Sequence, residues 1–305
     1  MAVWARLKER PEEGASGGGR RRGLRWAVGL AVVVMLLAVG GFVLFDRARP
    51  YLHGSGCEAR TSRGTMPLDL EQAANSATIA AVAFRKRLPE RAAVIAYATA
   101  IQESHIRNLP GGDRDSVGMF QQRPSQGWGT PDKLRDPVQS TSKFFDALVK
   151  IKDYLDRDLH DAAQLVQRSA DGTAYAQHEP DGELLATAFT GREPATARCW
   201  FPPDEQTASR RPEAILEMRR AFGSRLKVGG PGSLKAGAPS GPDSWNAVRP
   251  SSAREGWAVA SWAVTHAQAY GLTEIRFAGK RWTADAGHDG WTPDEDASED
   301  AVIVR

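Results

Sequence analysis

Apolar residues recur every three or four positions over much of the chain, and this spacing predicts a mainly helical protein. One helix is expected after the N-cap Asp69, and another where Asp136-Pro137 supplies an N-cap and a first-turn proline. Between them, residues 92–101 carry no charge, which is typical of a helix buried on every side. Further helices are predicted at 159–169, 182–189, 212–222 and 257–267.

Shorter patterns interrupt the helices. The turn-rich stretch 111–118 predicts a small hairpin, and residues 274–278 and 301–305 are expected to form strands. Pro202-Pro203 indicates a boundary, after which residues 228–254 are rich in Gly, Pro and Ser.

A run of 20 residues without a charge, 26–45, is long enough to cross the roughly 30 Å hydrocarbon core of a bilayer. It continues apolar where a signal peptide would need small residues for cleavage, which favours an uncleaved anchor. Four Lys or Arg precede the run within 15 residues and three follow it. This difference favours a cytoplasmic N-terminus without deciding it.

The expected fold class is therefore α+β, mainly α. A helical domain with a small hairpin follows one transmembrane helix and precedes a small α+β domain. The predicted parts are a cytoplasmic basic tail (1–25), the transmembrane helix (26–45), a linker (46–66), the helical domain (67–203) and the C-terminal domain (204–305).

Composition excludes several function classes. The 40 Lys and Arg nearly balance the 37 Asp and Glu, so the net charge of +3 predicts no nucleic-acid partner. Two cysteines cannot form a disulfide-dense scaffold or a four-cysteine zinc site. No His-Glu-x-x-His or Cys-x-x-Cys pattern occurs, and we expect neither a metal nor a cofactor.

Glu103 is the most informative residue, because it follows the uncharged helix directly. A carboxylate there is partly desolvated, and a helix C-terminus also disfavours its charge, so its protonated form is favoured. A protonated carboxyl group is what cleavage of a glycosidic bond requires. An ordinary surface glutamate in a last helical turn is the alternative.

Two motifs in order resemble the lysozyme-like superfamily, most closely the branch of soluble lytic transglycosylases and goose-type lysozymes and its membrane-anchored actinobacterial subgroup. They are Gln102-Glu103-Ser104 and, after a short interval, Gly118-Met119-Phe120-Gln121-Gln122-Arg123-Pro124. The resemblance covers roughly residues 57–200. It implies a lysozyme-like fold and an enzyme that cuts the β-1,4 bond between N-acetylmuramic acid and N-acetylglucosamine.

The resemblance implies that Glu103 is the general acid and that peptidoglycan glycan strands are the substrate. Ser104 is expected to orient the carboxylate or an N-acetyl group. The family's Ala-Tyr-Asn-Ala-Gly segment is absent as such, and its nearest counterpart contains the candidates Gln164 and Tyr175. Residues expected to contact the sugars are Ser104, Gln121, Gln122, Trp128, Gln164 and Tyr175.

The product of the reaction depends on whether a second carboxylate takes part. Asp113 and Asp115 are expected on the hairpin, where either turn chemistry or activation of a water explains them, and Asp115 is the candidate base. Without a base, the sugar's own hydroxyl attacks and an anhydro-muramic product forms. The motif match favours the anhydro route.

Cys57 and Cys199 bracket the helical domain, and we expect them to form a disulfide. A disulfide requires an oxidising compartment, which predicts that the catalytic domain lies outside the cell membrane and faces the cell wall. The alternative function is a catalytically inactive envelope scaffold that binds glycan, or a partner protein through residues 204–305.

Overall fold

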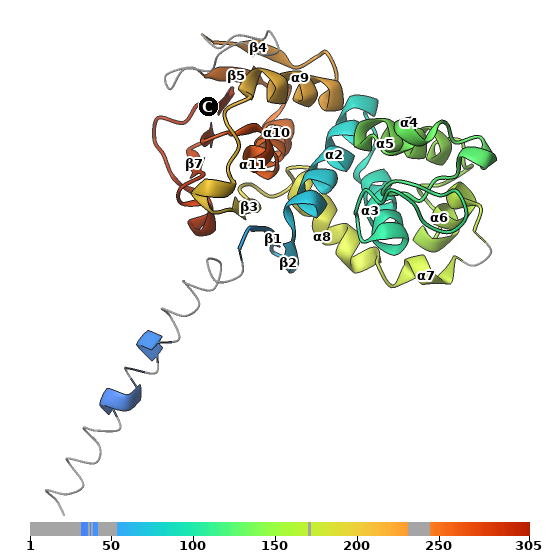
Figure 1. Cartoon of the computed structure of the whole chain (residues 1–305), viewed down its shortest axis with the longest axis horizontal. Coiled ribbons are helices and arrows are strands. Elements are labelled where there is room, and N and C mark those ends of the chain that lie inside the picture. The colour runs from blue at the N-terminus through green and yellow to red at the C-terminus, as the bar shows by residue number, and fades with distance from the viewer. Residues whose placement is uncertain (1–31, 36, 38, 42–53, 170–171, 231–244) are drawn as a thin grey trace, which may run out of the picture. The chain divides into compact units, whose positions relative to one another are not determined.

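The computed structural model describes residues 32–35, 37, 39–41, 54–169, 172–230 and 245–305 (Figure 1). It divides the chain into two compact units, residues 1–49 and residues 50–305. The predicted basic tail lies outside the described residues.

The transmembrane helix included in the predicted fold class is contradicted. Within the described ranges, no helix combines the length and the apolar character that crossing a bilayer requires. The described residues between 32 and 41 are helical and exposed. The rest of the predicted span, 26–45, lies outside the described residues.

The second unit is α+β. Its elements, in chain order, are β1 (Gly56–Thr61), β2 (Gly64–Leu68), α2 (Leu70–Lys86), α3 (Glu90–Ser104), η1 (Pro124–Gln126), α4 (Pro131–Leu134), α5 (Pro137–Leu148), α6 (Leu159–Gln167), α7 (Thr173–Ala176), α8 (Glu179–Phe189), β3 (Ala197–Trp200), η2 (Pro203–Glu205), α9 (Arg211–Phe222), β4 (Lys227–Gly229), β5 (Asn246–Arg249), α10 (Ala253–Thr265), α11 (Ala267–Tyr270), β6 (Glu274–Phe277), β7 (Lys280–Thr283), η3 (Gly287–Asp289), β8 (Thr292–Pro293) and β9 (Val302–Val304).

The predicted helix starts are confirmed. Asp69 accepts a hydrogen bond from the Gln72 backbone N–H, and the Gln72 side chain accepts one from the Asp69 backbone, which closes a capping box before α2. Asp136 caps α5 through the backbone N–H groups of Val138 and Gln139.

Residues expected to form part of a linker fold as strands instead. Antiparallel β1 pairs with β2 on one side and with β3 on the other, which gives a sheet in the order β2-β1-β3. Cys57 on β1 lies directly opposite Cys199 on β3, and the two form the predicted disulfide. The pairing partner β3 is far away in sequence, so the short polar run of β1 carries no local signal for it.

The predicted hairpin is displaced. Within 111–118 the described residues form turns rather than strands, and the bridge that does form joins Val117 to Gln122. Gly118 makes this turn possible, because its φ is +77° and a Cβ there would lie 2.3 Å from the Leu134 carbonyl oxygen.

The C-terminal segment forms a six-stranded antiparallel sheet in the order β4-β5-β9-β6-β7-β8, against which α10 packs. Helix α10 also contacts α2, so α2 lies between the C-terminal segment and helices α3 and α5 (Figure 1). The Trp282 and Trp291 indoles donate hydrogen bonds to the carbonyls of Cys199 and Ala197 on β3. One hydrophobic core therefore extends from the helices into this segment.

We predict that loss of the disulfide lowers the thermal unfolding midpoint by about 10 °C or more. The bond closes a loop of 142 residues, worth about 5 kcal/mol in the chain-entropy model, and each kcal/mol shifts the midpoint of a unit this size by roughly 2–4 °C. Thermal scans with and without reductant measure the shift. The Cys57→Ser/Cys199→Ser variant should unfold at the midpoint of the reduced wild type, both with and without reductant. A wild-type midpoint that reductant leaves unchanged would contradict the prediction.

Candidate active site

The buried helix α3 places Glu103 in its last turn. All residues from Ala92 to Ile101 are buried, so neither the direction nor the end of the helix can shift freely. The chain then turns sharply, because His105 and Ile106 both have left-handed φ values, +54° and +61°. Side-chain amides of α2 hold this turn: Gln72 donates to the His105 carbonyl and Asn75 to the Ile106 carbonyl.

Ser104 joins the two sequence motifs rather than touching the Glu103 carboxylate. Its buried hydroxyl donates to the Met119 carbonyl at 2.8 Å. A buried carbonyl without this donor would be an unsatisfied acceptor, at a cost of about 1–3 kcal/mol. Ser104 therefore fixes the segment after Gly118 against the end of α3.

Two donors converge on one oxygen of Glu103. The Tyr175 hydroxyl on α7 donates to Oε1 at 2.6 Å, and the Gln167 amide at the end of α6 donates to the same atom at 3.1 Å. The Gln167 amide also donates to the Phe120 carbonyl at 2.7 Å, so its nitrogen must face both acceptors. The carboxylate is thus held from two elements other than its own helix.

This arrangement assigns different roles to the two carboxyl oxygens. Oε1 accepts two hydrogen bonds, so a proton carried by Glu103 resides on Oε2, which no described residue hydrogen-bonds. Burial raises the pKa of the Tyr175 phenol well above its usual value, and the charge of Glu103 raises it further. Tyr175 therefore remains a donor throughout the physiological pH range.

Glu103 lines an open cavity of about 390 Å³. Amide and hydroxyl side chains dominate its walls, together with two arginines and Trp128. Trp128 is only 9% exposed, so it forms part of the wall and offers little free ring face for stacking. The polar lining residues besides Glu103 are Asp113, Ser116, Gln121, Gln122, Arg123, Gln126, Gln167, Arg168 and Ser169.

The predicted sugar-contacting amides are partly engaged within the protein. Gln121 accepts from the Ser116 hydroxyl and donates to the Gly118 carbonyl, and the buried Gln122 donates to the Ser140 carbonyl. Both line the cavity. Gln164 does not line it, and its amide donates to the Ser169 carbonyl instead.

Asp115 connects its own turn to the segment that begins at Arg123. Its carboxylate accepts from the Arg123 guanidinium at 2.9 Å and from the Ser125 backbone N–H and hydroxyl at 2.7 and 2.9 Å. The Ser125 backbone N–H, followed by the Arg123 guanidinium, lowers the pKa of Asp115 to about 2. Asp113, by contrast, lines the cavity with a side chain that is 92% exposed.

Sequence reasoning missed Gln167, Arg123 and Arg168 as cavity residues. Gln167 lies in the nearest counterpart of the family's Ala-Tyr-Asn-Ala-Gly segment, three residues after the candidate Gln164. One helical turn separates the two, and the sequence does not show which turn of α6 ends beside Glu103. Arg168 follows as the left-handed C-cap of α6, which directs it to the same end.

One group in the described part of the chain has metal-binding spacing, namely Asp158, His160 and Asp161 at the start of α6, whose ligand atoms lie within 4.8 Å of one another. None of the three lines the Glu103 cavity.

The chain matches no model of a known protein family, and no curated protein is significantly similar to it. Any assignment of function therefore depends on the geometry around Glu103 and on the two sequence motifs.

We predict that Asp115 contributes stability that disappears in acid. Because its pKa is lower in the folded protein, about 2 against 3.8, the contribution is complete above pH ~4 and is lost as the pH falls towards 2. Unfolding midpoints measured across this window should fall less steeply for Asp115→Asn than for the wild type.

Asp132→Asn is the matched control, since the Asp132 side chain is 94% exposed. Its profile should follow that of the wild type. If the unfolding midpoints of the wild type, Asp115→Asn and Asp132→Asn all fell equally steeply with pH, the stabilising role of Asp115 would be contradicted.

Proposed function

We propose that the chain is a peptidoglycan-cleaving glycosidase of the lytic transglycosylase type, with Glu103 as its acid–base residue. The observation that carries the proposal is the Glu103 carboxylate, held by Tyr175 and Gln167 in an open, amide-lined cavity. Amide and hydroxyl groups hydrogen-bond sugar hydroxyls and acetamido groups in both directions, so this lining suits a glycan. The two motifs that resemble lytic transglycosylases meet at this point through Ser104.

In the proposed reaction the proton on Oε2 of Glu103 passes to the glycosidic oxygen as the C1–O bond breaks. The ionised Glu103 then takes the proton of the muramic acid C6 hydroxyl while its oxygen bonds to C1. This step forms the anhydro ring and restores the protonated acid, so one carboxylate completes the cycle. Tyr175 and Gln167 stabilise the intermediate charge on Oε1, because both donate to it.

The position of the other carboxylates favours this route over hydrolysis. An inverting hydrolase needs a second carboxylate fixed roughly 6.5–9.5 Å from the acid with room for a water. In the described part of the chain, the Asp115 carboxylate accepts its hydrogen bonds from Arg123 and Ser125, and Asp115 does not line the cavity. Asp113 does line it, but among the described residues its exposed side chain has only a 3.9 Å ion pair with Arg114 to orient it.

The disulfide supports a location where such a substrate occurs. A bond between Cys57 and Cys199 persists in an oxidising environment, and peptidoglycan lies outside the reducing cytoplasm. We therefore propose that residues 54–305 act on the outer side of the cell membrane, facing the cell wall.

We expect Glu103→Gln to lower the rate of peptidoglycan solubilisation by at least ~100-fold, because no neighbouring group replaces the proton donor. Release of soluble fragments from purified cell walls by the full chain measures the rate. Asp113→Asn is the matched control: it removes the other cavity carboxylate and should retain most of the activity.

Equal rates for the wild type and Glu103→Gln would contradict the proposal. Glycan binding by both proteins without any product would favour the inactive envelope scaffold instead.

A further inference from the structure

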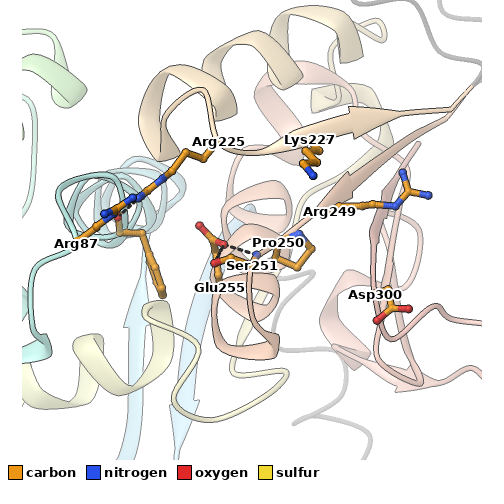
Figure 2. Close-up of a pocket in the computed structure, with 9 residues that line it drawn as sticks. Arg87, Arg225, Lys227, Arg249, Pro250, Ser251, Glu255 and Asp300 are labelled. Carbon is orange, nitrogen blue, oxygen red and sulfur yellow. Dashed lines mark hydrogen bonds between the residues drawn. The ribbon is translucent and has the colours of Figure 1, made fainter.

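A hollow of about 760 Å³ in the second unit shares no lining residue with the Glu103 cavity. It lies where the end of α2, the β4–β5 strand pair and the start of α10 meet (Figure 2). Its lining includes four cationic side chains, Arg87, Arg225, Lys227 and Arg249. We call this hollow the basic basin.

Two of these cations form a like-charge pair across neighbouring strands. Lys227 on β4 lies directly opposite Arg249 on β5 in the antiparallel register. Directly opposed residues have their Cβ atoms about 4.5–5.5 Å apart, and like charges in such positions destabilise a sheet. Stability alone therefore does not explain the pair.

No ion pair within the described part of the chain offsets this repulsion. Neither Lys227 nor Arg249 has a side-chain hydrogen bond or an ion pair there, and the same is true of Arg87. All three residues are exposed. Their charges are therefore available to a ligand.

Arg225 is the one cation of the basin with a structural role. Its guanidinium donates to the Phe84 and Arg85 carbonyls in the last turn of α2, at 3.0 and 3.4 Å. These bonds direct Arg225 towards the side of the basin where Arg87 lies (Figure 2). A positive charge is thus fixed there.

The basin keeps a net positive charge although two acids, Glu255 and Asp300, also line it. Glu255 is 6% exposed, and its Oε2 accepts from the Ser251 backbone N–H and hydroxyl, both at 2.6 Å. Glu255 is therefore bonded to Ser251 at the start of α10, as Figure 2 shows. Asp300 is the only other carboxylate of the lining, against four cations.

We propose that the basic basin binds an anionic polymer of phosphodiester-linked units that carry no aromatic bases. Guanidinium and ammonium groups are the side chains that bind phosphate. The exposed, separate cations suit a chain with repeated charges, and the hollow is much larger than one phosphate group. Proteins that bind single-stranded nucleic acid add aromatic side chains on which bases stack, whereas the one aromatic residue of this lining, Phe84, is partly buried.

The test measures binding of synthetic poly(glycerol phosphate) to the full chain at several salt concentrations. The variant Lys227→Gln/Arg249→Gln should bind at least ~10-fold more weakly and reduce the slope of log affinity against log salt by about 2, because two fewer phosphate groups are neutralised. Its thermal midpoint should not fall, because the substitutions remove a repulsion.

The control Lys152→Gln/Lys280→Gln removes the same charge at positions outside the basin lining and should bind like the wild type. The proposal is overturned if both variants weaken equally, if poly(glycerol phosphate) does not bind, or if oligo-deoxythymidylate of equal charge binds more tightly. Glu103→Gln should bind the polymer normally, because this site does not depend on the proposed activity.

Discussion

Helix α3 is buried along nearly its whole length by α2, α5, α6, α7 and α8, and this constraint determines where the candidate acid lies. A helix enclosed in this way cannot rotate or slide without disturbing five neighbours at once. A residue of its last turn is consequently held in one position, half-buried beside the cavity. Glu103 occupies that position, and the left-handed residues after it turn the chain away and leave the carboxylate beside the cavity.

The surrounding hydrogen bonds refine this placement at some cost in stability. With its nitrogen facing Glu103 and Phe120, Gln167 leaves its own Oε1 buried and without a partner among the described residues. Buried polar groups in native proteins are nearly always satisfied, so each exception calls for an explanation. The like-charge pair Lys227 and Arg249 is a second local conflict in the same unit. Both conflicts are understandable if each region binds a ligand.

Local patterns in the sequence were sufficient to predict the helices that build the site. Asp69 and Asp136 were recognisable as caps because capping depends on neighbours within one turn, and the uncharged stretch before Glu103 identified the buried helix. Pairing over long distances was not recognisable: β1 meets β3 across the whole helical part, and the choice between Gln164 and Gln167 depends on where α6 ends. The transmembrane helix expected over 26–45 was not found, since no helix in the described part of the chain is long and apolar enough to cross a bilayer.

The central claim is that Glu103 acts as the only acid–base residue, supported by Tyr175 and Gln167. The most direct measurement is the mass of the products released from purified glycan strands by the full chain. The account predicts muropeptide products whose summed mass equals that of the strand, because the anhydro ring forms without added water. A gain of one water for each bond cleaved, abolished by Asp113→Asn in a protein that still folds, would contradict the claim and identify a second catalytic carboxylate.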